Sequence, residues 1–237
     1  MKTILITGAS SDMAHCLIEK IAPDYDKILA HYNSSKDKLE KLKAKIGDKL
    51  ILLQADFRDK NATKEFIEKI ENIELPNHIV HFPASKLNPQ RFDKSSWEEL
   101  ADDIMIQLHS IYRISQKFIK QMSKNENSKI IFMLSSATIN IPKFNTNYLI
   151  AKYSLLGLMK SLSKEYEGKM QINAISPVLT ETKFLENIPE FVIEQSAQNS
   201  PIKRNLKPED VAFEIIKLLN NNMLNGENIL IDKRSAP

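Results

Sequence analysis

Short runs of Ile, Val and Leu alternate along this chain with longer amphipathic segments, and this alternation limits the fold more than any other feature of the sequence. The apolar runs predict seven strands, at residues 3–7, 27–31, 50–54, 78–82, 129–134, 171–176 and 228–232. The amphipathic segments predict six helices between them, at residues 13–22, 36–46, 61–73, 97–123, 148–166 and 208–221. Strands that are apolar throughout are buried on both faces, which is typical of a parallel sheet covered by helices. We therefore expect an α/β fold, doubly wound around one seven-stranded parallel sheet flanked by helices.

The composition excludes several classes of protein. The chain has 237 residues, which suits one domain over residues 1–237, and its 33 basic and 30 acidic residues are spread without the basic cluster of a nucleic-acid binder. No segment approaches the roughly 18 apolar residues that a membrane span needs. The single cysteine, Cys16, allows neither an internal disulfide nor a multi-thiolate metal site. We expect a cytoplasmic protein with no metal, no nucleic-acid partner and no membrane partner.

Glycine is scarce. Average usage would give about 17 glycines in a chain of this length. Only five are present, at positions 8, 47, 157, 168 and 226. A fold built on glycine-rich loops is therefore disfavoured at the outset.

The first predicted strand runs into a turn of small residues and then a helix start, with the sequence Thr-Gly-Ala-Ser-Ser-Asp-Met-Ala at residues 7–14. Amide groups at a helix N-terminus that faces such a turn can bind the pyrophosphate of a dinucleotide. An ordinary strand–helix turn capped by Asp12 fits the segment equally well when it is taken alone. Other motifs have to decide between the two interpretations.

The second motif is the pair Tyr148 and Lys152, four residues apart on a predicted helix. This spacing places both polar ends on one helix face, where they can converge on one substrate atom. Together with the first loop, this pair resembles the short-chain dehydrogenase/reductase family, whose loop pattern is TGxxxGxG and whose catalytic motif is YxxxK. The similarity is strongest to its 3-oxoacyl-ACP-reductase-like branch. The resemblance implies a Rossmann fold and an NAD(P)-dependent oxidoreductase of the EC 1.1.1 type.

The resemblance runs in order along nearly the whole chain and assigns the site residues one by one. It implies that Ser136, Tyr148, Lys152 and Gln107 are the catalytic residues. It also implies that the cofactor contacts Thr7, Gly8, Ser10, Ser11, Asp12, Met13, Asn33, Ser34, Ser35, Asp56, Phe57, Pro83, Ala84, Pro177, Val178, Thr180 and Thr182, together with Tyr148 and Lys152.

The chemistry implied is proton transfer by a tyrosine. A free phenol has a pKa of about 10, so we expect the Lys152 ammonium, together with the positive charge of the oxidised nicotinamide, to lower the pKa of Tyr148. In the reduction, Tyr148 donates a proton to the carbonyl oxygen while hydride arrives from the nicotinamide, and Ser136 donates a hydrogen bond to the same oxygen. The substrate is then a small or acyl-carrier-linked carbonyl compound, a 3-oxoacyl or related keto compound among them.

The end of the second predicted strand bears on the choice of cofactor. An NAD-preferring site offers an acid there for the ribose hydroxyls. No acid is present in this segment, whereas Ser34, Ser35 and Lys36 can accommodate a 2′-phosphate. NADP(H) is therefore favoured over NAD(H).

Several positions depart from the family pattern. Asp12 and Ala14 stand where the second and third glycines of the loop are expected, Pro83 and Ala84 replace part of an Asn-Asn-Ala-Gly segment, and valine replaces glycine at 178. A carboxylate beside a pyrophosphate is repelled, unless Asp12 turns away to cap its own helix. Two hypotheses follow: a working NADP(H)-dependent reductase, or a non-catalytic relative that serves as a binding or assembly subunit.

Two further expectations concern the surroundings of the site. Residues 180–206 have weak periodicity and are a candidate substrate lid, although a packed pair of short helices fits them as well. Relatives of this size form homodimers or homotetramers through the long helices, here around residues 97–122 and 148–166.

Overall fold

The computed structural model describes residues 1–232 and contains one parallel sheet. Its order is β3-β2-β1-β4-β5-β6-β7, and every neighbouring pair is parallel. The strands are β1 (Thr3–Thr7), β2 (Lys27–Tyr32), β3 (Leu50–Gln54), β4 (His78–His81), β5 (Lys129–Met133), β6 (Gln171–Pro177) and β7 (Asn228–Ile231). All seven predicted strands are confirmed, within one residue at each end.

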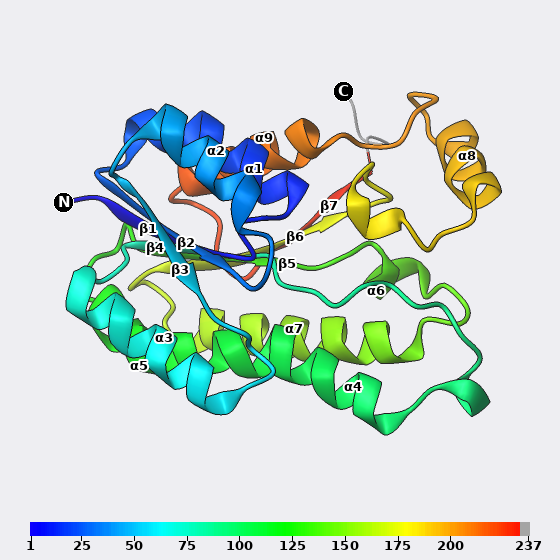
Figure 1. The fold of residues 1–237 in the computed structure, drawn as a ribbon, viewed down its shortest axis with the longest axis horizontal. Coiled ribbons are helices and arrows are strands. Elements are labelled where there is room, and N and C mark those ends of the chain that lie inside the picture. Colours follow the sequence, from blue (N-terminus) through cyan, green and yellow to red (C-terminus); the bar gives the residue numbers. More distant parts are fainter. Residues whose placement is uncertain (233–237) are drawn as a thin grey trace.

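Helices cover both faces of the sheet (Figure 1). One layer is α1 (Asp12–Ile21), α2 (Lys36–Ile46) and α9 (Pro208–Leu219), and the other is α3 (Lys60–Ile73), α4 (Trp97–Asp103), α5 (Ser110–Met122) and α7 (Thr146–Glu165). Side chains alternate between the two cores along each strand, so that Ile4 and Ile6 pack under the first layer and Leu5 under the second. The burial of both faces explains why the strands are apolar throughout, and the doubly wound prediction is confirmed.

The prediction of one continuous helix over residues 97–123 is wrong in one respect. A π-helical turn, η3 (Ile104–His109), separates α4 from α5. A π turn holds one more residue per hydrogen-bonded ring than an α turn and re-aims the backbone groups around it. Gln107 lies within η3 and is fully buried.

The candidate lid contains two short helices, η4 (Lys183–Leu185) and α8 (Glu190–Asn199), and α8 lies at the edge of the molecule, away from the sheet (Figure 1). A parallel bridge between Thr180 and Leu206 closes the base of this segment. The remaining short elements are η1 (Ala22–Asp24), η2 (Phe92–Lys94) and α6 (Ala137–Asn140). Among residues 1–232, no helix is long and apolar enough to cross a membrane.

Candidate active site

The candidate site lies where the strands end at their carboxyl edge, because parallel strands bring all their following loops together there. Gly8, just after β1, has φ of +68°, and a Cβ on it would lie 3.0 Å from the backbone nitrogen of Pro83. The loop after β1 therefore packs directly against the segment after β4. Only glycine fits both the backbone angle and the space.

The N-terminus of α1 has the groups that a pyrophosphate needs. Ser11 caps the helix, since its Oγ accepts a hydrogen bond of 3.3 Å from the amide of Ala14. The amides of Asp12 and Met13 have no acceptor among the described residues. These two free donors at the positive end of a helix fit a dinucleotide phosphate.

Asp12 neither caps its own helix nor stands unpaired. Its Oδ1 accepts from Lys38 Nζ at 2.6 Å, and its Oδ2 accepts from the backbone amide of Lys183 at 2.9 Å. Burial raises the pKa of this carboxyl, but Lys38 and the Lys183 amide together lower it below its usual value. The alternative in which Asp12 caps its own helix is therefore wrong, because Ser11 performs that role and Asp12 instead joins the first loop to α2 and to the candidate lid.

His31, near the end of β2, ties two loops of the site together. Its Nδ1 accepts from the Gly8 amide at 3.0 Å, and its Nε2 lies 3.1 Å from the Ala55 carbonyl, to which it donates. The ring stacks on Phe57 with centroids 3.9 Å apart. Burial lowers the pKa of His31 to about 4, so the ring is neutral at pH 7.

His81, at the end of β4, makes a second brace of the same kind. Its Nδ1 accepts from Thr7 Oγ1 at 2.7 Å, and its Nε2 donates to the Gln107 carbonyl at 2.8 Å. Burial lowers the pKa of His81 to about 3. The histidine thus links β1 to the π turn. The Gln107 carbonyl, which belongs to a residue of the predicted catalytic set, therefore already accepts a hydrogen bond from His81.

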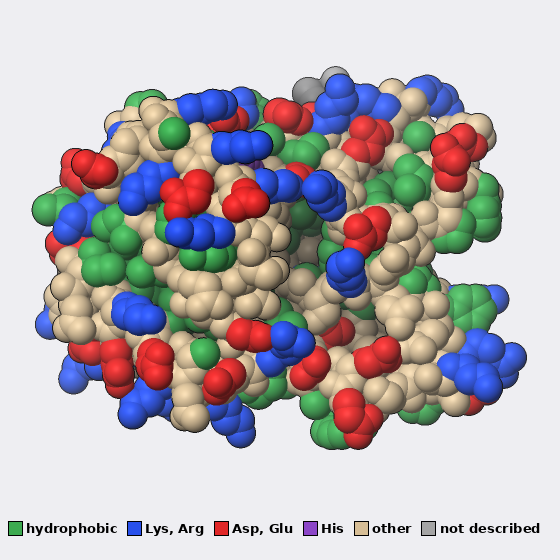
Figure 2. All heavy atoms as spheres, viewed as in Figure 1, with side chains coloured by type: hydrophobic (Ala, Val, Ile, Leu, Met, Phe, Trp, Pro, Cys, Tyr) green, Lys and Arg blue, Asp and Glu red, His purple; other side chains and the backbone are tan. Residues whose placement is uncertain are grey.

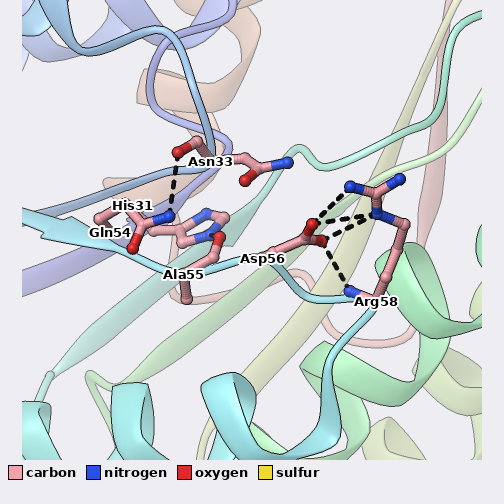
Figure 3. A network of polar contacts seen from close by, with 6 residues as sticks. All are labelled: His31, Asn33, Gln54, Ala55, Asp56 and Arg58. Carbon is pink, nitrogen blue, oxygen red and sulfur yellow. Dashed lines mark hydrogen bonds and ion pairs between the residues drawn. The ribbon is translucent and has the colours of Figure 1, made fainter.

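The segment after β2 carries the proposed selectivity groups on its surface. Ser34, Ser35 and Lys36 are exposed, and Ser35 makes no capping hydrogen bond with its side chain. The Asn33 carbonyl accepts from Gln54 on the neighbouring strand (Figure 3). Position 33 is an asparagine and not an acid. The exposed hydroxyls and lysine that follow it are compatible with a 2′-phosphate.

Asp56 and Phe57, after β3, are already engaged within the protein. Both carboxylate oxygens of Asp56 accept from Arg58, and the hydrogen bonds and charge of Arg58 lower the pKa of Asp56 (Figure 3). The Phe57 ring is buried against His31. A cofactor contact at Asp56 stays a prediction, and the Phe57 ring packs in the core.

Tyr148 and Lys152 lie together on α7, as the spacing predicts, with Lys152 Nζ 5.6 Å from the centre of the Tyr148 ring. Lys152 is buried, and its Nζ donates to the Met133 carbonyl at the end of β5 at 2.9 Å. Burial lowers the pKa of Lys152 to about 8, although the nearby Asp103 carboxylate raises it.

The expected lowering of the tyrosine pKa is not what the protein groups produce. Burial raises the pKa of Tyr148 to about 12, a hydrogen bond with Ser135 lowers it, and the charge of Asp103 raises it. Removal from water therefore outweighs the neighbouring groups. With that pKa the side chain is protonated at neutral pH, the state that a proton donor in carbonyl reduction needs.

The serine beside Tyr148 is Ser135 and not Ser136. Ser135 shares a hydrogen bond with the Tyr148 hydroxyl, and its Oγ also accepts from the Ala137 amide. Ser136 instead begins α6, its amide donating to the Pro177 carbonyl and its carbonyl accepting from the Asn140 amide. This contact favours Ser135 over the predicted Ser136, because the sequence does not show where β5 ends and α6 begins, and the catalytic role of the serine stays a prediction.

The remaining predicted cofactor positions surround the same edge. Pro83 and Ala84 follow β4, Pro177 ends β6, and Val178 packs against the first core. Thr180 Oγ1 donates to the Val178 carbonyl, and Thr182 precedes the amide that Asp12 holds. Of these segments, Pro83 lies against Gly8 and the Lys183 amide binds Asp12, and the cofactor contacts stay predictions.

A cavity of about 160 Å³ opens beside Tyr148. Residues 85–90 after β4, the helix α4 and residues 144–148 line it. From the candidate lid, Phe184 meets Tyr148 with ring centroids 6.1 Å apart. Figure 2 shows the surface hollowed near the middle of this face and notched at its edge beside α8. A ketone in this cavity would place its oxygen at Tyr148 and its substituents against α4.

Sequence reasoning missed four contributors to the site: Ser135, His31, His81 and Asp103. A histidine at the carboxyl end of a buried strand was a usable signal for two of them. Asp103 gave no signal, because acids are common on exposed helices. Among residues 1–232, no group of three His, Cys, Asp or Glu side chains could hold a metal ion.

Known proteins resemble this chain in sequence and in fold. Residues 9–233 match the family model described as Enoyl-(Acyl carrier protein) reductase. The 3-oxoacyl-[acyl-carrier-protein] reductase FabG of Thermotoga maritima is 26% identical over 98% of this chain and 96% of its own. The uncharacterized oxidoreductase YmfI of Bacillus subtilis is 26% identical over 89% of this chain and 88% of its own.

Solved structures share the fold. A short-chain dehydrogenase from Burkholderia cenocepacia in complex with NADP superimposes with a TM-score of 0.86 at 19% identity, covering 98% of this chain and 96% of that one. A 3-ketoacyl-(acyl-carrier-protein) reductase from Brucella melitensis complexed with NADH gives 0.87 at 22% identity, covering 99% and 98%.

Proposed function

Because the chain belongs to the short-chain dehydrogenase/reductase family of NAD(P)-dependent oxidoreductases, we propose that it interconverts a carbonyl group and an alcohol with NADP(H) as its preferred cofactor. The observation that carries this proposal is the convergence of Lys152 and Ser135 on Tyr148, which lines the cavity. The names of the similar reductases support a 3-oxoacyl or related keto compound, free or carrier-linked, as substrate.

The chain's own groups perform the proton chemistry. When bound, the nicotinamide supplies the hydride. Tyr148, protonated at neutral pH, donates its proton to the carbonyl oxygen, and Ser135 donates a hydrogen bond to the same atom. Lys152, fixed by the Met133 carbonyl, places a positive charge where the tyrosine becomes an anion.

The amides of Asp12 and Met13 would hold the pyrophosphate, and Thr182 and Val178 would lie along the cofactor from the other side. The 2′-phosphate would contact Ser34, Ser35 and Lys36. In the structure, Lys36 Nζ lies 2.8 Å from a carboxylate oxygen of Glu40. The absence of an acid at Asn33 supports NADP(H) over NAD(H). Residues 180–206 would act as the substrate lid, with Phe184 over Tyr148.

Assembly and location complete the proposal. Large apolar side chains are exposed on the helices that would form a homodimer or homotetramer, namely Trp97 on α4, Tyr112 on α5, and Ile150 and Tyr153 on α7. Burying such a surface between copies is favourable. The lone free thiol of Cys16 is compatible with a cytoplasmic location. Light scattering of the purified protein would test the assembly.

The function is tested by titrating the protein with NADPH and NADH and then assaying a panel of ketones. NADPH should bind more tightly than NADH, and Tyr148→Phe should retain NADPH binding while losing about 10²–10⁴ in reduction rate. A matched control, Tyr153→Phe, changes a phenol on the same helix outside the cavity. Failure to bind either cofactor at millimolar concentration would overturn the proposal and favour the non-catalytic subunit.

A further inference from the structure

Apolar surface and polar side chains together line the cavity beside Tyr148, and the polar side chains include three acids of α4. Figure 2 shows Asp and Glu side chains gathered over α4, and three acids of this helix line the cavity. Besides Tyr148, the polar residues that line it are Ser85, Lys86, Asn88, Gln90, Ser95, Glu99, Asp102, Asp103, Asn145, Thr146 and Asn147. A fatty acyl chain would bury these groups against methylenes, which costs free energy because their hydrogen bonds with water are not replaced.

Among the three acids, Asp103 is the one positioned to accept a hydrogen bond from a substrate. It lines the cavity together with Tyr148, and its charge acts on both Tyr148 and Lys152. Its Oδ1 accepts a hydrogen bond of 3.3 Å from Gln107 Nε2, while its Oδ2 has no hydrogen-bond donor among residues 1–232. A carboxylate accepts hydrogen bonds only, so the complementary ligand group is a donor.

Three more polar atoms near this cavity lack partners among the described residues. Gln107 is fully buried, and its Oε1 makes no hydrogen bond to any described residue. The same is true of Asn145 Oδ1 and Ser85 Oγ, which belong to the cavity lining. Buried polar atoms are nearly always paired, so these unpaired atoms near the cavity are groups that a polar ligand or a water molecule can satisfy.

The charges favour a neutral donor over a cationic one. The Asp103 carboxylate lies close enough to Lys152 to raise the pKa of that ammonium, and the oxidised nicotinamide is itself positive. A substrate ammonium beside Asp103 would be repelled by the positive charges of Lys152 and the oxidised nicotinamide. A hydroxyl donates to the Asp103 carboxylate without that repulsion. A cavity of about 160 Å³ also favours a short substrate over a long one.

We propose that the substrate is a small neutral ketone that carries a hydroxyl group next to its carbonyl, with Asp103 as the acceptor for that hydroxyl. This inference rests on the proposed function and narrows its substrate. The carbonyl carbon gains a hydride from the reduced cofactor, the oxygen gains a proton from Tyr148, and the products are a vicinal diol and the oxidised cofactor.

The test compares hydroxyacetone with butanone, two ketones of nearly the same shape that differ in a hydroxyl against a methyl group. The wild-type protein should reduce hydroxyacetone with a kcat/KM on the order of tenfold or more above that for butanone, because a site built to bind a hydroxyl rejects the analogue without it. Asp103→Asn should bring the two values together. The control Glu98→Gln makes the same change outside the cavity and should keep the wild-type ratio.

Equal kcat/KM values for hydroxyacetone and butanone in the wild-type protein would overturn the inference and leave the reductase function standing. A higher value for aminoacetone, or for a short 3-oxoacyl thioester, would also overturn it and would identify a cationic or an acyl substrate instead. Reduction of no ketone in the panel, despite tight NADPH binding, would contradict the proposed function itself. The wild-type ratio tests the substrate class even if Asp103→Asn fails to fold, and the change of that ratio in Asp103→Asn tests Asp103 as the acceptor.

Discussion

Replacing Asp12 with asparagine tests how the first loop holds a cofactor. In the structure Asp12 stands at the start of α1, with Lys38 Nζ 2.6 Å from Oδ1 and the Lys183 amide 2.9 Å from Oδ2. Asparagine keeps an oxygen that can accept from the Lys183 amide and removes the negative charge. The substitution therefore separates the charge of Asp12 from its contact with the candidate lid.

The size of the effect follows from simple electrostatics. Two like charges 4 Å apart repel by about 1 kcal/mol at the dielectric of water and by about 4 kcal/mol at an effective value of 20. Lys38 offsets much of this repulsion in the wild-type protein, and in the variant its charge is left to attract the phosphates. We expect a gain of about 1.4 kcal/mol, or roughly tenfold tighter NADPH binding. The lost, partly exposed ion pair should cost about 0.2–1 kcal/mol of unfolding free energy.

The assay is calorimetric titration of NADPH into the wild-type protein, Asp12→Asn and the control Asp48→Asn, which removes an exposed acid from the turn before β3. The dissociation constant should fall for Asp12→Asn and stay unchanged for Asp48→Asn at the same ionic strength. Raising the salt concentration should narrow the difference, because the effect is electrostatic. Unchanged or weaker NADPH binding by Asp12→Asn would refute the repulsion argument.

Four further outcomes are expected. Ser135→Ala should lower kcat by about 10²–10³, whereas Ser136→Ala should leave it nearly unchanged, and steady-state assays giving the reverse order would restore Ser136 to the site. Gly8→Ala should lower the unfolding free energy in urea by about 1–3 kcal/mol, because φ is +68° and the added Cβ meets backbone at 3.0 Å. The pKa of His81 is about 3 in the folded protein and about 6.5 in the unfolded chain. The unfolded state therefore binds the proton first, and the free energy of unfolding falls as the pH drops below 6.5. In urea titrations between pH 7 and about 4, His81→Asn should flatten this dependence of the unfolding free energy on pH. With the pKa of Lys152 at about 8, kcat/KM for reduction should fall above that pH, and a flat profile there would contradict the role of its charge.

Much of the fold could be read from the sequence because each strand is apolar along its length. Residues 3–7, for example, are buried on both faces, and only a central parallel strand gives that pattern. The helix over residues 97–123 was predicted without its interruption, since a π turn leaves the amphipathic pattern almost intact. The site could be outlined for a similar reason: Tyr148 and Lys152 are fixed relative to each other by helical spacing alone.

Other parts of the site depend on contacts between distant segments. Ser135 and Ser136 are adjacent and chemically alike, so only the end of β5 decides which hydroxyl reaches Tyr148. The charge of Asp12 was visible in the sequence, but its neutralisation by Lys38 requires α2 to pack beside α1.

The sequence by itself determined the order of strands and helices, the loop at Gly8 and the pairing of Tyr148 with Lys152, because each of these rests on local spacing. The tertiary structure alone decided the electrostatics: the two neutral histidines that brace the loops, the raised pKa of Tyr148, and the approach of Asp103 to the catalytic pair. Those properties arise from burial and from charges on separate elements, and both exist only once the chain has folded.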